Sequence, residues 1–141
     1  MKNIEQVLKE QGICITTTKG NSMEPMLVEG RDKVVVVPPE FPLKKYDVPV
    51  YRRFDHYTMH RIIKVTKNGY IICGDNRADL EKDITDSDII GVLDGFYQGD
   101  RDISCNDEEF LNYGKNAVRG LFKRRAICFI QKVTRRLKKI F

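Results

Sequence analysis

The chain has 141 residues, of which 41% are hydrophobic and 32% charged, and its formal net charge is +5 at pH 7. This length fits one domain with its own core and excludes two ordinary domains. The cysteines Cys14, Cys73, Cys105 and Cys128 are scattered and form no Cys-x-x-Cys pair. They therefore predict neither a zinc site nor a disulfide framework, no metal or cofactor is expected, and a reducing, cytoplasmic location is the simplest expectation.

Short apolar runs alternate with turn-rich pieces through most of the chain. Residues 2–11 predict a short helix that ends before Gly12, because Ile4, Val7 and Leu8 share one face. The strands that we expect cover 13–18, 33–37, 48–52, 58–65, 70–73 and 88–93. A series of short strands separated by turns predicts a mainly β fold.

One serine lies in a restricted turn, within the segment Gly20-Asn21-Ser22-Met23-Glu24-Pro25. Pro25 fixes its own φ and favours an extended Glu24, while Gly20 permits close backbone approach just before the serine. Such a turn presents a side chain rigidly, as a nucleophilic serine requires. A hydroxyl is nevertheless a weak nucleophile without a neighbouring base, so the sequence must supply one.

The chain has two histidines, and the second is the better candidate base. His60 falls in the expected strand 58–65, and the Asn68-Gly69 pair that follows predicts a hairpin with the next strand. His56 is expected in an exposed loop. Two histidines four residues apart bind zinc when they lie on a helix, so this pair does not favour a metal site.

Three motifs follow one another in order: Ser-Met-Glu-Pro at 22–25, His-Arg-Ile-Ile at 60–63 and Gly-Asp-Asn at 74–76. Together they resemble the clan of serine peptidases that contains signal peptidase I and LexA, over about residues 20–93. Histidine at the base position resembles the branch found in the endoplasmic-reticulum signal peptidase complex and in some Gram-positive bacteria. The resemblance implies a LexA/signal-peptidase-like β-fold of short antiparallel strands, with a short N-terminal helix and a basic amphipathic C-terminal helix added in this chain.

The resemblance also implies the roles of the catalytic residues. The family's nucleophile falls on Ser22 and its general base on His60. Its acidic residue follows the Gly-Asp-Asn turn and falls nearest Glu81, with Asp79 and Asp83 as alternatives. A carboxylate there would orient the imidazole and stabilise the imidazolium that forms when the serine loses its proton.

The oxyanion and substrate-binding residues are expected around the serine: Gly20, Asn21, Met23, Pro25 and Asp75. Many relatives carry a serine at the position of Gly20, so here only backbone N–H groups near Ser22 remain to bind the oxyanion. Met23 is equally explained as a packing residue, and Asp75 as a residue that caps a turn.

Residues 115–141 hold ten of the 25 basic residues and none of the 20 acidic residues, which leaves 15 basic and 20 acidic residues in 1–114. Apolar residues recur there at three- and four-residue steps, as on one face of a helix. The basic residues that we expect to form a membrane or partner surface are Arg119, Lys123, Arg124, Lys132, Arg135 and Arg136. Such a helix typically lies on an anionic membrane or binds an acidic partner. The alternative for this chain is that the apolar stripe packs on the β-domain. Nucleic acid is disfavoured because no reading motif accompanies the charge.

The expected organisation is a catalytic domain over 1–99, a polar linker over 100–114 and the basic amphipathic helix over 115–141. The leading interpretation is a serine endopeptidase with a Ser–His dyad that cleaves a leader or precursor peptide, bound as an added strand, at a small-residue site.

Two other functions are considered. A catalytically weak peptide-binding or maturation partner is the first, and a LexA-like self-cleaving switch is the second, disfavoured because fewer than twenty residues precede Gly20. The charged N-terminus lacks the apolar core of a signal peptide, and no segment offers the roughly 20 apolar residues of a spanning helix. We therefore expect a cytoplasmic protein peripheral to the membrane.

Overall fold

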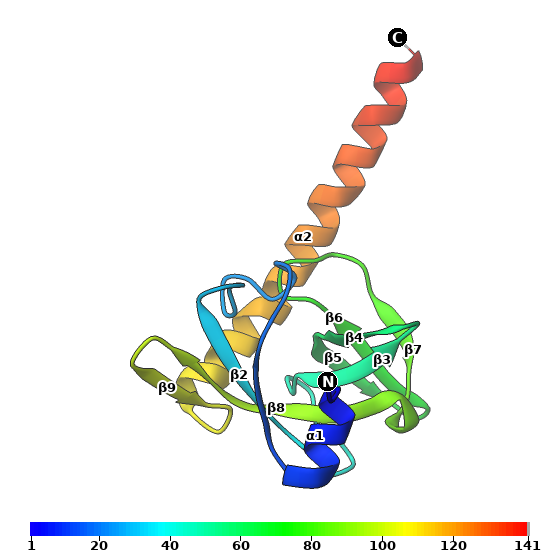
Figure 1. Cartoon of the computed structure of the whole chain (residues 1–141). Helices are drawn as coiled ribbons and strands as arrows, with labels where there is room; N and C mark the ends of the chain where they lie inside the picture. The colour runs from blue at the N-terminus through cyan, green and yellow to red at the C-terminus, as the bar shows by residue number, and fades with distance from the viewer. Residues whose placement is uncertain (141) are drawn as a thin grey trace.

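Two antiparallel sheets form the body of the protein, and a long helix projects from it (Figure 1). This computed structural model describes residues 1–140. The larger sheet has the strand order β1-β2-β8-β3-β4, with β9 paired to β8, and it curls into a half-barrel. Its strands are β1 (Cys14–Thr17), β2 (Asp32–Val37), β3 (Pro49–Arg53), β4 (His56–Met59), β8 (Ile89–Gln98) and β9 (Arg101–Ser104).

The smaller sheet has the order β5-β6-β7 and follows from a hairpin. Its strands are β5 (Arg61–Thr66), β6 (Gly69–Cys73) and β7 (Glu81–Ile84), after which a short 3-10 turn, η1 (Asp86–Asp88), leads into β8. The turn between β5 and β6 contains the Asn68-Gly69 pair, and Gly69 has φ +155°, a conformation that glycine adopts readily. The predicted hairpin is therefore confirmed.

The N-terminal helix α1 (Ile4–Gln11) is defined by its caps. The Asn3 side chain accepts a hydrogen bond from the N–H of Gln6 at 2.9 Å, and Gly12 ends the helix in the left-handed conformation with φ 73°. Leu8, on the inner face of the helix, is buried in the core. The helix predicted over 2–11 is confirmed, with a start two residues later.

Two hydrophobic clusters hold the sheets together. The first joins the half-barrel to α1, to the turn around Ser22 and to the start of the C-terminal helix, and includes Leu8, Met23, Leu27, Val34, Val36 and Phe110. The second lies on the smaller sheet and includes Leu43, Tyr51, Ile62, Tyr70, Ile72 and Ile84. Tyr51 of β3 belongs to the second cluster, so the larger sheet also contributes to the core of the smaller one.

The structure corrects the strand expected over 58–65. The strand β4 ends at Met59 and pairs with β3 in the larger sheet, whereas β5 begins at Arg61 in the smaller sheet. His60 lies between them, at the point where the chain passes from one sheet to the other. The strands expected at 13–18, 33–37, 48–52, 70–73 and 88–93 are present as β1, β2, β3, β6 and the first half of β8.

The structure also corrects the linker expected over 100–114. This segment contains β9 and the first turns of α2 (Glu108–Ile140), a helix of 33 residues. Phe110, Gly114 and Leu121 of α2 are buried against the body, so the polar residues here belong to the exposed sides of ordered elements. The architecture is therefore mixed α/β, with antiparallel sheets and a long C-terminal helix. Residue 141, the last of the expected helix 115–141, lies outside the described residues.

None of the helices within residues 1–140 is long and apolar enough to cross a membrane.

Candidate active site

Ser22 lies in a tight turn between β1 and β2, and its neighbours fix the turn to the core. The N–H of Leu27 donates to the carbonyl of Met23 at 3.0 Å, and the side chains of both residues are buried. Gly20 enters the turn with φ +81° and donates its N–H to Glu29 at 2.9 Å. The serine itself is half-buried.

The loop after β6 lies directly against this turn. The N–H of Asn76 donates to the carbonyl of Ser22 at 2.8 Å, and the Arg77 guanidinium donates to Asn21 Oδ1 at 2.6 Å. A Cβ placed on Gly74 would lie 2.8 Å from the Ser22 carbonyl oxygen and 3.1 Å from His60 Cδ2. The absence of a side chain at position 74 therefore leaves room for both the serine turn and the His60 ring.

His60 is held by two side chains on the edge of its ring that carries Nδ1. This nitrogen lies 3.0 Å from Glu81 Oε1 and 3.1 Å from Tyr51 Oη. An ionised carboxylate only accepts hydrogen bonds, so Nδ1 carries the proton and Nε2 is left as the basic nitrogen. Nε2 is bonded to Cδ2, the ring atom that lies close to Gly74, so this edge of the ring borders the loop whose Asn76 bonds to the Ser22 carbonyl.

The electrostatics of Glu81 suit an orienting carboxylate. Burial alone would raise its pKa, but hydrogen bonds from His60 and Tyr51 and the charge of Arg53 outweigh burial, so the pKa of Glu81 is lowered. Arg53 Nε lies 3.2 Å from Glu81 Oε2, the oxygen that His60 does not use. Glu81 is therefore ionised at neutral pH and able to stabilise an imidazolium.

Tyr51 is a member of this cluster that the sequence analysis missed. Its O–H donates to Glu81 Oε1 at 2.5 Å, and the ring is fully buried. Burial first, and then the neighbouring Glu81 carboxylate, raise the pKa of Tyr51 far above its usual value, so it stays a neutral donor. Tyr51 lies in a segment predicted as a strand, but it is nine residues from His60 and thirty from Glu81, so no local spacing indicates the contact.

The structure distinguishes the three candidate acids. Glu81 contacts His60, whereas the exposed Asp83 pairs with Arg53 at 3.1 Å. Asp79 is exposed and lines a hollow beside α2. Among residues 1–140 no hydrogen bond joins the Ser22 and His60 side chains, although the Ser22 carbonyl and the His60 ring both lie beside Gly74. In unliganded enzymes such bonds are often long and tighten only when substrate binds.

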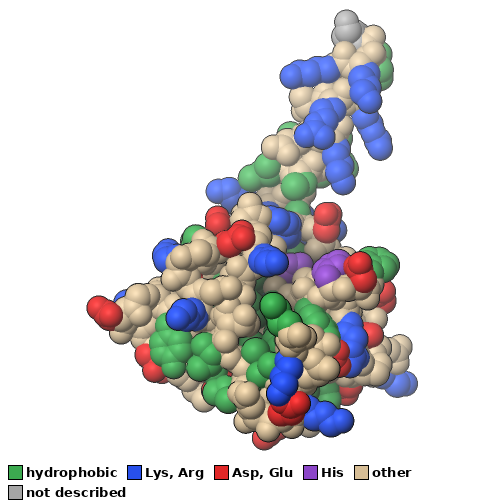
Figure 2. Space-filling model, in the orientation of Figure 1, with side chains coloured by type: hydrophobic (Ala, Val, Ile, Leu, Met, Phe, Trp, Pro, Cys, Tyr) green, Lys and Arg blue, Asp and Glu red, His purple; other side chains and the backbone are tan. Residues whose placement is uncertain are grey.

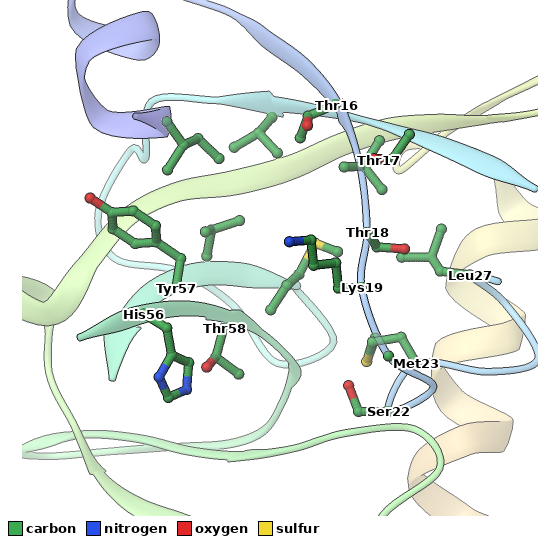
Figure 3. Close-up of a pocket in the computed structure, with 16 residues that line it drawn as sticks. Thr16, Thr17, Thr18, Lys19, Ser22, Met23, Leu27, His56, Tyr57 and Thr58 are labelled. Carbon is green, nitrogen blue, oxygen red and sulfur yellow. The ribbon is translucent and has the colours of Figure 1, made fainter. Parts of the chain in front are cut away.

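A groove of about 500 Å³ begins at Ser22 and runs between two edge strands (Figure 3). Thr16, Thr17, Thr18 and Lys19 form one wall, and His56, Tyr57 and Thr58 form the other, with Ser22 and Met23 at one end. The floor is apolar and includes Leu27, Val34, Val36 and Val50. Because β1 and β4 are the outer strands of the larger sheet, each leaves one row of backbone hydrogen-bonding groups without a strand partner.

The expected substrate-binding residues divide into two groups. Gly20 and Met23 line the groove with Ser22, and His56, expected in a loop, begins β4 and lines it as well. Asn21 instead bonds to the Gly-Asp-Asn loop, and Pro25 lines a separate hollow near α2. Of these four expected residues, Gly20 and Met23 therefore line the groove, and Asn21 and Pro25 do not.

Asp75 was expected near the substrate but lies in a buried ion pair. Its carboxylate accepts bonds from Arg61 Nε at 2.8 Å and Nη2 at 2.9 Å, and the two side chains are 2% and 1% exposed. The Arg61 guanidinium also lies over the rings of Phe110 and Tyr113, 5.2 and 5.7 Å from their centroids. The pair ties the loop beside Ser22 to α2, which is a structural position and not a substrate contact.

The basic residues of α2 also divide. Arg124 Nε donates to the carbonyl of Arg77 and Arg125 Nη1 to the carbonyl of Ala78, both at 2.8 Å, so Arg124 is committed to the body. The other members of the expected surface are exposed along α2: Arg119, Lys123, Lys132, Arg135 and Arg136. In Figure 2, Lys and Arg side chains gather on the projecting end of the helix.

No three His, Cys, Asp or Glu side chains within residues 1–140 are grouped so that they could hold a metal ion. Comparison of the chain with protein-family models and with curated protein sequences found no match.

Proposed function

We propose that this protein is a serine endopeptidase with a signal-peptidase/LexA-like fold, in which Ser22 is the nucleophile and His60 the general base. One observation carries the proposal. The ring of His60 is held at Nδ1 by Glu81 and Tyr51, while its Cδ2 and the backbone carbonyl of Ser22 both lie close to the same position beside Gly74. Ser22 also lines one end of a groove between two edge strands.

The chemistry follows from this arrangement. Ser22 Oγ attacks the scissile carbonyl carbon, and its proton passes to His60 Nε2. The ionised Glu81 stabilises the imidazolium, which then gives the proton to the leaving amine as the peptide bond breaks. Water attacks the resulting ester, again with His60 as base, and releases the acid product and free Ser22.

The oxyanion must be stabilised mainly by backbone N–H groups near Ser22. A side chain at position 20 would have open space around its Cβ, but φ is +81° there, a conformation that strains any residue with a Cβ. The turn therefore disfavours the serine that many relatives carry at this position. Losing one oxyanion donor costs roughly 2.7–4 kcal/mol of transition-state stabilisation in a well-studied protease, so slow turnover is consistent with this site.

The groove suits an extended peptide. A substrate strand between β1 and β4 would satisfy the free backbone groups of both edges, as in other cases of strand addition. Its side chains would alternate between solvent and the floor of Leu27, Val34 and Val36. The substrate class is accordingly a leader or precursor segment that is unfolded at the cleavage site.

A fluorophosphonate probe tests the proposal directly, because an activated serine displaces fluoride and forms a Ser–O–P bond. We expect the probe to label the wild type and the Ser87→Ala control, an exposed serine far from His60 in sequence, and not Ser22→Ala or His60→Ala. Labelling that persists in Ser22→Ala would overturn the assignment of the nucleophile. An unlabelled wild type that still binds extended peptides would favour the second candidate function, a catalytically weak peptide-binding protein, which the glycine at position 20 permits.

A further inference from the structure

The outer part of α2, residues 126–140, extends away from the body (Figure 1). Residues 129–140 are all exposed, and Arg124 and Arg125 make the last hydrogen bonds of α2 to the loop beside Ser22. Phe129 and Lys132 still border the open hollow that Asp79 of this loop lines. The body therefore leaves residues 129–140 exposed to solvent.

Large apolar side chains nevertheless form a stripe on the exposed helix. Its members are Phe122, Phe129, Ile130, Val133, Leu137 and Ile140, and Phe122 and Phe129 are 83% and 68% exposed. At about 100° per residue they fall within an arc of about 100°. The stripe is centred about a third of a turn away from Phe110, Gly114 and Leu121, the residues that dock on the body. It is therefore a separate apolar face and not a continuation of the docked one.

The charge of this segment is of one sign. Lys132, Arg135, Arg136, Lys138 and Lys139 lie within residues 126–140, and no acidic residue does. At the same angular step they cover the side of the helix away from the centre of the stripe. Two copies of the helix that paired through their stripes would bring these like charges close together, which disfavours a second copy as the occupant.

We propose that the outer part of α2 docks on the surface of an anionic lipid bilayer. A helix with bulky apolar residues on one face and Lys or Arg on the other lies in the plane of the interface, with its apolar face at the headgroup–acyl boundary. Each basic residue near an anionic leaflet strengthens binding roughly fivefold. Charge complementarity with phosphate headgroups and the stripe thus act together over about 22 Å of helix.

Docking would also place the candidate active site. Arg124 and Arg125 tie the base of the outer part to the carbonyls of Arg77 and Ala78, in the loop whose Asn76 bonds to Ser22. The serine turn is therefore held near the lipid surface. Cleavage of substrates at that surface rests on the proposed peptidase function, but binding to lipid does not.

Sedimentation of the full chain with vesicles tests the proposal without reference to activity. The vesicles contain phosphatidylcholine alone or phosphatidylcholine with phosphatidylglycerol, at about 0.1 M and about 1 M salt, where the Debye length falls from about 10 to about 3 Å. We expect binding to the anionic vesicles at low salt and release at high salt. Lys132→Gln/Arg136→Gln should bind about 25-fold more weakly at low salt, at about fivefold per charge.

A matched pair of uncharged variants separates insertion of the stripe from adhesion by charge alone. Val133→Gln alters the stripe, whereas Thr134→Gln alters an exposed β-branched residue beside it, outside the arc. We expect Val133→Gln to weaken binding about tenfold, because a buried valine loses its apolar contact, and Thr134→Gln to change it less than about twofold. Equal binding by the two variants, or no binding of the wild type to anionic vesicles, would overturn the proposal. So would a vesicle-free dimer that Val133→Gln converts to monomer, because the stripe would then belong to a second copy.

Discussion

His60 and Arg61 are neighbours in the chain, yet they serve two different polar clusters. The His60 side chain is 15% exposed and bonds to Glu81 and Tyr51, while the Arg61 side chain is 1% exposed and bonds to Asp75. Side chains of successive residues in extended chain point to opposite sides, so one dipeptide supplies both the candidate base and the buried pair behind it. Two adjacent polar residues of one motif therefore occupy different environments, and polarity alone does not distinguish the candidate base from the residue of the buried ion pair.

We call Ser22, His60, Glu81 and Tyr51 the reactive cluster, and the buried pair of Arg61 and Asp75 the supporting cluster. The largest expected effect concerns the reactive cluster. We expect Ser22→Ala, His60→Ala and the double variant each to lose at least about a thousandfold in kcat/KM on a cleavable peptide, with similar losses, because residues that share one step are strongly non-additive. The thermal unfolding of Ser22→Ala should change little, because Ser22 is only partly buried, whereas His60→Ala also removes a hydrogen bond to Glu81 and should lose some stability. Independent losses that multiply in the double variant would break the assignment of the two residues to one cluster.

The supporting cluster should show the reverse pattern. Arg61→Met leaves the Asp75 carboxylate buried without its partner, so we expect the free energy of unfolding to fall by about 3–5 kcal/mol in urea titrations. Lys64→Met, an exposed basic residue of the same strand, is the control and should change it by less than about 0.5 kcal/mol. Arg61→Met/Asp75→Leu should recover much of the loss. Equal stability of Arg61→Met and Lys64→Met would show that the pair does not support the loop.

In the proposed mechanism Glu81 acts through His60, to which it is hydrogen-bonded. Glu81→Gln keeps the shape and removes the charge that stabilises the imidazolium, so we expect kcat to fall by about a hundredfold. Asp83→Asn, two residues further along β7 and exposed, should retain activity within about twofold. A loss of the same size in Asp83→Asn would move the orienting role to the neighbouring acid.

The pH dependence of stability tests independently whether the Glu81 carboxylate is favourably hydrogen-bonded in the folded protein. Its pKa is lower in the folded protein than in the unfolded chain, so its contribution is present above the unfolded value of about 4.3 and is lost as pH falls through the folded value. The wild type should therefore lose stability in acid more steeply than Glu81→Gln. Parallel curves for the two proteins would mean that the carboxylate is not favourably bonded.

Much of this site could be predicted from the sequence, and the failures have physical causes. The turn of Ser22 and the hairpin at Asn68-Gly69 are local and follow from proline, glycine and turn chemistry. The break at His60 was missed because the apolar pattern continues through a residue at which the chain changes sheets. Asp75 was placed near substrate because its burial depends on Arg61, fourteen residues away.

The prediction of a linker over 100–114 was wrong for a similar reason, because the structure of this segment depends on contacts with residues distant in the sequence. Polar residues between 100 and 114 suggested a linker, but Phe110 and Gly114 contact the body through one narrow face of α2. The Arg61 guanidinium lies 2.8 Å from the position of a Cβ at Gly114, so this glycine permits the helix to approach the ion pair. Such a contact depends on residues more than fifty positions apart, and no pattern within the segment reveals it.

The smallest expected effect concerns Tyr51, which connects the two kinds of role because it is fully buried and yet belongs to the reactive cluster. Tyr51→Phe removes the donor to Glu81, and hydrogen bonds to charged groups contribute about 1.5–3 kcal/mol to stability. The matched control is Tyr70→Phe, a buried tyrosine of the same hydrophobic cluster whose O–H donates to Asp86 at 2.6 Å. We expect similar losses of stability in the two variants but a loss of about tenfold in kcat only in Tyr51→Phe, equivalent to about 1.4 kcal/mol. Alkaline pH separates the wild type from either variant, because burial and a neighbouring carboxylate raise the pKa of both Tyr51 and Tyr70. Above about pH 10 the unfolded chain ionises while folded Tyr51 does not, so the wild type loses stability there and Tyr51→Phe lacks that part of the loss. Equal activity in both variants would place Tyr51 with the supporting residues and leave Glu81 alone to orient His60.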